Sequence, residues 1–346
     1  MAGGAAAGLL ACLAIAAIAR FAGSALQLGL ETAVALVIGL AVGGVVSLRE
    51  RLIPGATLAS RYALRVGITL LGARLTLGQL VSTGAGSVLA IVLVVSTALV
   101  LGTWLARRLG LVPPLSALVT VGMAICGNSA ILALSPIIGA KHRDTAYAVS
   151  TITIFGLVGV LLLPVIGRVL AMPDTIFGTW AGLAVNDTAQ VVATGYAFSP
   201  AAGDVATVVK LTRNLAILPV LLGATWLVTR SHGADDGTAA TPAGSRIAMV
   251  SRAVPWFVIG FVIVAGLRSV GLLDARLPVG GTLADLCSLL ASLLILVALA
   301  GVGLATDIRS LSAVGPRPFL LGASMWLAIG LLGLALAGLV AGLYPI

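Results

Sequence analysis

The chain has 346 residues, of which 60% are hydrophobic and 9% are charged. Charged residues make up about a quarter of an ordinary soluble domain, so this composition excludes a water-soluble globule and indicates an integral membrane protein. The formal charge of +9 comes from basic residues scattered between apolar runs, which reports membrane orientation and gives no sign of a nucleic-acid partner. Cys12, Cys126 and Cys287 lie in apolar stretches without metal-ligand or disulfide spacing, and we expect no cofactor.

The first apolar segment, 2–19, is long enough to be the core of a signal peptide. A signal peptide begins with a basic stretch, however, and the first basic residue here is Arg20. We therefore predict that this segment is a retained first helix.

The apolar segments together predict an all-α polytopic membrane protein. A helix needs about 20 apolar residues to cross a hydrocarbon layer about 30 Å thick. Two segments, 114–140 and 174–198, are long enough but are interrupted by polar residues. With them we expect about 9–11 transmembrane segments in one domain, 1–346, with a soluble connection at 230–252. The uninterrupted candidates are 3–19, 32–47, 62–80, 86–105, 145–167, 203–229, 253–270, 282–305 and 317–342.

Basic residues in short loops mark the cytoplasmic side of a membrane protein. If each interrupted segment enters and leaves by one face, Lys141 and Arg143 fall on the side that holds most basic residues, and Arg168 falls on the other. If both segments cross the membrane, these three residues change sides. The charge count slightly favours re-entry and leaves both arrangements open.

The two interrupted segments resemble each other. Cys126-Gly127-Asn128-Ser129-Ala130 is similar to Val185-Asn186-Asp187-Thr188-Ala189, and a similar helix start follows each: Asp144 sixteen residues after Asn128, and Asp204 seventeen after Asp187. Re-entry would make the two segments antiparallel. We predict an inverted repeat, because paired interrupted segments of this kind point to the binding site of a transporter.

The first interruption places Asn128 and Ser129 between two apolar half-spans. Both residue types suit the start of a helix, and Gly127 permits an unusual backbone angle. A half-helix that starts inside the membrane offers free N–H groups to an anion. The alternative is a kinked helix in which Asn128 bonds a neighbour.

The second interruption contains Asp187, the one acid that lies deep in an apolar segment. It would bind a proton or a sodium ion, with Asn186, Thr188 and Gln190 supplying oxygens. Alternatively it caps a half-helix or pairs with a buried cation. Apart from this sodium possibility we expect no metal site.

A third polar group follows in 207–214, where Lys210 shares a helical face with Thr207 and Asn214, and Arg213 lies on the adjoining face. Cations inside the membrane suit an oxyanion, because guanidinium binds carboxylate, sulfonate or sulfate with two hydrogen bonds. The alternative is that both side chains reach lipid headgroups. Arg65 is predicted to anchor a helix end. Arg74 lies deeper or marks the other end, and both arginines are further candidates for cations in the membrane interior.

Four stretches carry a resemblance to a known family: GMAICGNSAI, FGTWAGLAVNDTAQVVATG, ATVVKLTRN and GVGLATDIRSL. They resemble the YeiH-like family of bacterial inner-membrane sulfate exporters, over about residues 30–340. Members often have Gly-Gly-Ser after the cysteine and a histidine before the aspartate, whereas this chain has Gly127-Asn128-Ser129 and Asn186. The resemblance implies distant kinship with bile-acid/sodium symporter-like folds, with two inverted repeats and broken helices that cross the membrane.

These features predict a secondary active transporter in the bacterial inner membrane. It would move a small anion (sulfate, sulfonate or a similar oxyanion) by alternating access, with coupling to H⁺ or Na⁺. The alternative is an anion channel. An enzyme is not expected, because the chain lacks a His-Glu-x-x-His pair and a Gly-x-Ser-x-Gly elbow. The oligomeric state, a homo-oligomer included, is left open. The residues assigned to substrate and coupling ion are Asn128, Ser129, Asp187, Thr188, Gln190, Lys210 and Arg213.

Overall fold

The computed structural model describes residues 2–26, 31–231, 255–278, 280–306 and 315–343. Within these residues the chain is helical and forms no strand, which confirms the all-α class. The predicted connection at 230–252 lies, from residue 232 onward, outside the described residues. The helices are α1 (Ala2–Leu26), α2 (Glu31–Gly43), α3 (Val46–Leu58), α4 (Leu64–Leu71), α5 (Leu77–Arg108), α6 (Pro113–Ala124), α7 (Asn128–Leu134), α8 (His142–Val169), α9 (Asp174–Ala184), α10 (Thr188–Phe198), α11 (Pro200–Asn214), α12 (Ile217–Ser231), α14 (Trp256–Ser269), α15 (Leu283–Ala305) and α16 (Pro316–Leu343). Short turns of other helix types join them: η1 (Ala59–Ala63, a π-helix), η2 (Gly72–Arg74) and η3 (Leu272–Asp274).

In the described part of the chain, six helical stretches are long and apolar enough to cross a membrane, as expected for a multi-pass membrane protein. The spans predicted at 32–47, 62–80 and 253–270 contain the shorter helices α2, α4 and α14. The six long stretches are Gly4–Ala22, Leu77–Arg108, His142–Val169, Pro200–Val228, Leu283–Ala305 and Pro316–Val340.

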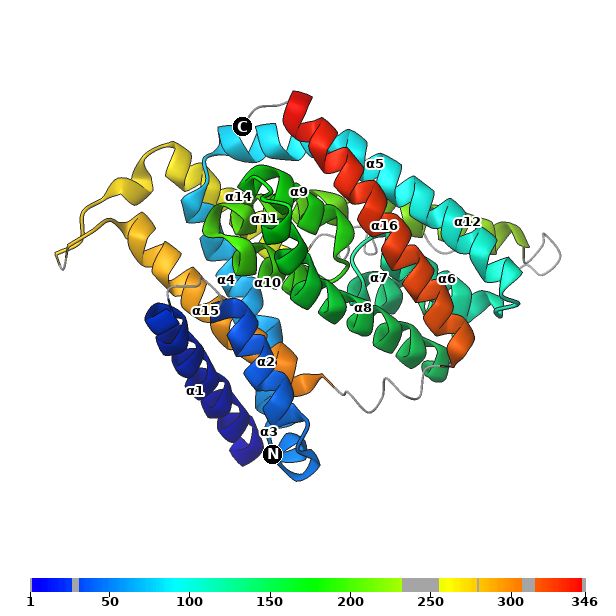
Figure 1. Ribbon diagram of the computed structural model, residues 1–346, viewed down its shortest axis with the longest axis horizontal. Coiled ribbons are helices and arrows are strands. Elements are labelled where there is room, and N and C mark those ends of the chain that lie inside the picture. The colour runs from blue at the N-terminus through cyan, green and yellow to red at the C-terminus, as the bar shows by residue number, and fades with distance from the viewer. Residues whose placement is uncertain (1, 27–30, 232–254, 279, 307–314, 344–346) are drawn as a thin grey trace.

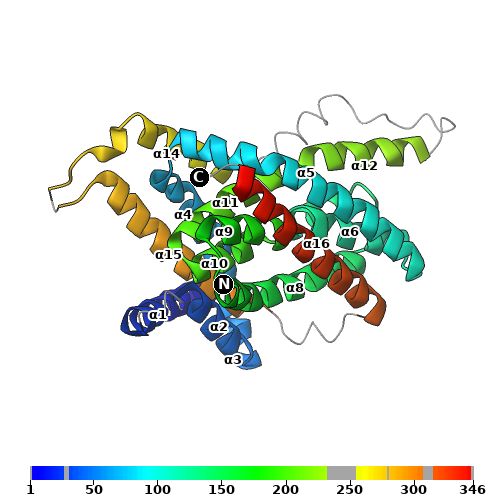
Figure 2. The same cartoon turned by 45° about the horizontal axis from the view of Figure 1, so that its top comes forward.

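The helices pack as two bundles (Figure 1). Bundle I contains α1 to α4, α14 and α15, so that α15, late in the sequence, lies against α2. Bundle II contains α5 to α12 and α16. Figure 2 shows the same division after rotation, with α1, α2, α3 and α15 on one side and α5, α6 and α16 on the other. The two bundles meet mainly where α10 packs against α2 and α15, and where α14 packs against α5.

An apolar layer fills the interface between the bundles. Ile68 and Leu71 of α4 and Leu299 of α15 belong to bundle I, and they share one buried cluster with Val192 and Ala193 of α10 in bundle II. These side chains are 2% exposed or less. The layer therefore closes the middle of the interface to water.

Both interrupted segments return to the end of the molecule at which they start. Asp174, the first residue of α9, accepts a 2.6 Å hydrogen bond from Ser199, which follows α10. The other segment begins after α5 and ends before α8, and in Figure 1 the end of α5 and the start of α8 lie at the same right-hand end. At the far end of α8, Arg168 donates to the carbonyl of Ala197 near the end of α10. The two segments thus enter from opposite ends.

Candidate functional site

The two chain breaks touch each other inside bundle II. The chain leaves helical conformation between α6 and α7, where Gly127 has φ 63° and ψ −122°. A Cβ on Gly127 would lie 3.5 Å from the Cα of Asp187, which is the N-cap of α10. Only glycine adopts this backbone conformation without strain.

Lys210 and Arg213 hold the two breaks together. The Lys210 ammonium donates to the carbonyls of Ile125, at 2.8 Å, and Val185, at 3.0 Å. The side chains of Lys210 and Arg213 are both 0% exposed. The guanidinium of Arg213 donates to Met123 (2.8 Å) and Leu183 (2.6 Å), with further bonds to the carbonyls of Ala124 (3.2 Å) and Val185 (3.3 Å). These carbonyls lie at the C-terminal ends of α6 and α9, where helices leave carbonyls unpaired and carry partial negative charge.

This placement differs from the expectation that Lys210 and Arg213 contact the solute directly. Their N–H groups point to backbone carbonyls, and neither side chain lines the cavity described next. They do not reach lipid headgroups either, since both are fully buried. Among the described residues no ion pair joins Lys210 to Asp187. Lys210 and Arg213 therefore hold the two chain breaks together without lining the cavity.

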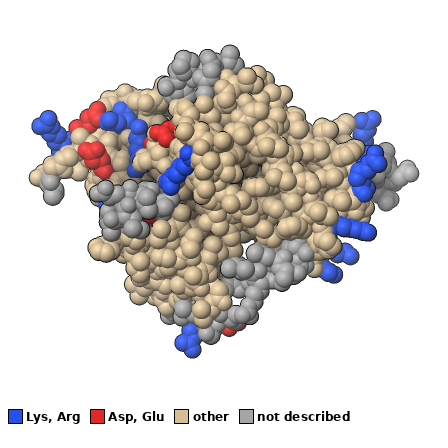
Figure 3. Space-filling model, viewed as in Figure 1, with Lys and Arg blue, Asp and Glu red and all other residues tan. Residues whose placement is uncertain are grey.

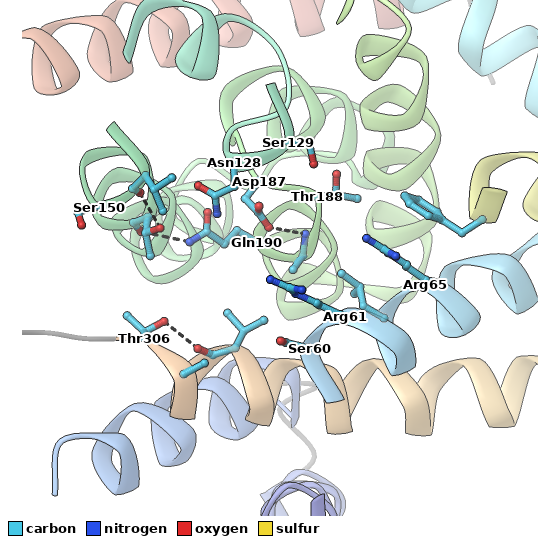
Figure 4. A pocket seen from close by; sticks show the side chains of 17 residues that line it. Ser60, Arg61, Arg65, Asn128, Ser129, Ser150, Asp187, Thr188, Gln190 and Thr306 are labelled. Atoms are coloured by element: carbon cyan, nitrogen blue, oxygen red, sulfur yellow. Dashed lines mark hydrogen bonds between the residues drawn. The ribbon is translucent and has the colours of Figure 1, made fainter. Parts of the chain in front are cut away.

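A cavity of about 390 Å³ lies beside the breaks, between the two bundles (Figure 4). Five of the seven predicted site residues line it: Asn128, Ser129, Asp187, Thr188 and Gln190. Bundle II adds Val149, Ser150, Thr153 and Ala189, while bundle I contributes Ser60, Arg61, Leu64, Arg65, Phe257, Val302, Ala305 and Thr306.

Asp187 faces this cavity and caps α10. Its carboxylate accepts a 2.9 Å hydrogen bond from the backbone N–H of Ala189, which is the capping role considered from the sequence. Next to it, the Thr188 hydroxyl is 3.4 Å from the amide nitrogen of Asn214. The α10 N-terminus and its acid therefore meet at one wall of the cavity.

Two buried oxygen atoms on the same wall have no hydrogen-bond partner within the described residues: Asn128 Oδ1 and Gln190 Oε1. The Gln190 amide nitrogen donates 3.1 Å to the carbonyl of Thr153, which leaves its oxygen free. Gly156 makes room for this side chain, because a Cβ there would overlap Gln190 Oε1. An unpaired buried acceptor costs about 1–3 kcal/mol, so both oxygens lie at a cost within the wall of the cavity.

The opposite wall carries two arginines whose role the sequence reasoning missed. Arg61 and Arg65 line the cavity from η1 and α4, and Figure 4 shows both side chains extending toward Asp187 and Gln190. Neither guanidinium has a hydrogen-bond or ion-pair partner in the described part of the chain. The signal in the sequence is the i, i+4 spacing of Arg61 and Arg65, which places both on one helical face.

Sequence comparison identifies the family of the chain. The family described as "Conserved hypothetical protein 698" matches residues 7–322. The chain belongs to this family. Its relatives carry the name UPF0324 membrane protein. This name describes a membrane protein and does not mention sulfate or export.

Three relatives illustrate the range of similarity. A UPF0324 membrane protein of Clostridium tetani is 36% identical over 289 residues, which is 82% of this chain and 82% of the relative. The relative Atu0671 of Agrobacterium fabrum is 35% identical over 337 residues, covering 95% and 91% of the two chains. The relative M6_Spy0799 of Streptococcus pyogenes is 32% identical over 333 residues, covering 95% of each. No solved structure matches the chain significantly.

Proposed function

We propose that this protein is a secondary active transporter of a small oxyanion in the bacterial inner membrane. The observation that carries the proposal is the cavity between the bundles, in which the unpartnered guanidinium groups of Arg61 and Arg65 face Asp187 and the N-terminus of α10. Two guanidinium groups on one wall of a cavity suit a sulfate, sulfonate or similar anion, which both can bind with paired hydrogen bonds.

The same cavity supplies a place for a coupling cation. The Asp187 carboxylate and the unpartnered oxygens of Asn128 and Gln190 are oxygen acceptors, which suit Na⁺ or a proton. With Arg61 and Arg65 on one wall and these acceptors on the other, an anion and a cation would bind next to each other. Each would then stabilise the other electrostatically, which couples their binding.

The two-bundle architecture favours an alternating-access mechanism and argues against an open channel. The apolar layer that includes Ile68, Val192 and Leu299 closes the interface beyond the cavity. A solute would pass only if one bundle moved against the other, as in transporters built from two moving parts. Movement would carry Arg61 and Arg65, in bundle I, past the breaks in bundle II.

The charge distribution supports an orientation. Figure 3 shows basic side chains without acidic neighbours at the right-hand edge, whereas acidic and basic side chains are mixed at the upper left. Arg107, Arg108, Lys141 and Arg143 lie at the helix ends next to the first interrupted segment. By the positive-inside rule, this end and the cavity with Arg61 and Arg65 face the cytoplasm.

The proposal is tested by flux of radioactive sulfate in proteoliposomes. We expect saturable flux by the unaltered protein, and a fall of at least about tenfold in Arg65→Gln, because a charge-assisted hydrogen bond contributes more than 1.4 kcal/mol. Arg143→Gln is the matched control, since Arg143 is exposed and stacks on Tyr147 outside the cavity. Equal flux in Arg65→Gln and Arg143→Gln, or no anion flux at all, would contradict the proposal.

A further inference from the structure

A second cavity, of about 430 Å³, lies at the other end of the bundle interface. Like the first, it is lined from both bundles. Bundle I contributes Arg20, Glu31, Thr32, Arg74, Leu289, Ser292, Ile295 and Leu296, and bundle II contributes Tyr196, Phe198, Ser199 and Pro200.

The two cavities are aligned along the same helices, with the apolar layer between them. On α10, Gln190 lines the first cavity and Tyr196 lines the second, with Val192 in the apolar layer between them. The two lining residues are six positions apart on the helix, which is about 9 Å. Along η1, α4 and η2, the order is Arg65, then Ile68 and Leu71 of the layer, then Arg74.

Arg74 is held firmly by its own bundle and loosely by the other. Its guanidinium donates to the hydroxyl of Ser292 at 2.7 Å and to the carbonyl of Ser288 at 3.2 Å, both on α15. Across the interface its polar contacts are longer, at 3.4 Å to the Tyr196 hydroxyl and 3.7 Å to the Asp204 carboxylate, and the guanidinium lies 5.5 Å from the centre of the Tyr196 ring. Asp204 has a partner in its own bundle, because the Tyr196 hydroxyl donates to it.

We propose that this second cavity is an oxyanion site on the far side of the apolar layer, with Arg74 as its cation. In this structure the Asp204 carboxylate contacts the guanidinium where the solute anion would bind. When the bundles separate at this end, Arg74 stays with Ser288 and Ser292, Asp204 stays with Tyr196, and the guanidinium is freed for the solute. Arg20 lines the same cavity and adds a second positive charge, while Glu31 adds a negative one. The inference extends the proposed transport function, since it gives the anion a second place to bind.

The charge of this cavity is measurable without any transport. Leu289 lines it and is 45% exposed, so Leu289→Cys places a reactive thiol there in a protein whose Cys12, Cys126 and Cys287 are replaced by alanine. The probes are an anionic, sulfonate-bearing and a cationic, trimethylammonium-bearing methanethiosulfonate. Each labelling rate is divided by the rate with free cysteine. We expect the anionic probe to be favoured, and sulfate to slow its reaction in detergent without phospholipid.

Arg74→Gln should lower this preference for the anionic probe about tenfold, because it removes the charge that attracts the anion. Arg74→Lys should keep it, which separates charge from folding. Asp204→Asn should raise it, because the competing carboxylate loses its charge. Arg268→Gln is the matched control: Arg268 pairs with Asp274 and lines neither cavity.

Three results would overturn the inference. The first is a preference for the cationic probe, and the second is an equal effect of Arg74→Gln and Arg268→Gln. The third is protection by phosphatidylglycerol but not by sulfate, which would identify a lipid headgroup site. Sulfate flux distinguishes this failure from failure of the proposed function. Charge-selective labelling and sulfate protection without any flux would refute the transporter and leave the second site standing. Flux without that labelling pattern would refute the second site alone.

Discussion

Gly127 and Asp187 lie side by side: a Cβ on Gly127 would be 3.5 Å from the Cα of Asp187. They belong to two segments that enter bundle II from opposite ends. Gly127 precedes α7 and Asp187 caps α10, so the two helices that carry Asn128 and Gln190 begin next to each other at this wall of the cavity. Four predictions follow from this arrangement and from the cations that support it.

Gly127→Ala should destabilise the protein by about 1–3 kcal/mol, because alanine adopts a positive φ only with strain and its methyl group would crowd Ile152, 3.2 Å away. Thermal unfolding in detergent measures the change. Gly139→Ala is the control for strain alone, since Gly139 has φ 61° and nothing within 4 Å of an added Cβ. Equal loss of stability in both variants would show that crowding against Ile152 adds nothing to the backbone strain.

Arg213→Met should reduce stability by more than about 1–3 kcal/mol, because it leaves the buried carbonyls of Met123 and Leu183 without this donor. Lys210→Met should reduce stability by about 1–3 kcal/mol, because it leaves the carbonyl of Ile125 without its donor while Val185 keeps the bond from Arg213. Denaturation in detergent tests this, with Arg65→Gln as the comparison. The Arg65 guanidinium has no partner in the described part of the chain, so its loss should change stability by less than about 0.5 kcal/mol. The account of Lys210 and Arg213 as structural cations fails if their variants are as stable as Arg65→Gln.

The sequence predicts those features that depend on residues close together along the chain. Low charge and long apolar runs identify a helical membrane protein, and Gly127 and Asp187 are residue types that favour helix breaks and starts. The partners of Lys210 could not be predicted, because backbone carbonyls have no side-chain signature in a sequence. From the sequence, Arg65 is predicted to anchor a helix end and Arg61 is assigned no site role, since only the packing of bundle I against bundle II brings both to the breaks.

Asp187→Asn should abolish the dependence of sulfate flux on a Na⁺ or H⁺ gradient while it leaves the start of α10 intact. Asparagine caps a helix about as well as aspartate, so the Ala189 hydrogen bond survives and the negative charge does not. Flux is measured with and without each gradient. Asp187→Ala removes both the charge and the cap, so its free energy of unfolding should also fall by about 1 kcal/mol. Gradient-dependent flux in Asp187→Asn would exclude Asp187 as the coupling residue.

Gly156→Ala should weaken binding of the coupling cation, because the added methyl group would displace the Gln190 amide from the cavity wall. The measurement is the Na⁺ or proton concentration that gives half-maximal sulfate flux, which should rise. Gly338→Ala is the control, since an added Cβ on Gly338 has nothing within 4 Å. An unchanged half-maximal concentration in Gly156→Ala would remove Gln190 from the cation site.

The most direct measurement is the position of a bound anion. Selenate has the charge and tetrahedral shape of sulfate, and its selenium is located by anomalous X-ray scattering from crystals soaked in selenate. The account predicts a peak in the cavity, within hydrogen-bonding distance of the guanidinium groups of Arg61 or Arg65, and its disappearance in Arg65→Gln. Selenate bound against Lys210 and Arg213 instead, or found nowhere in either cavity, would contradict the account.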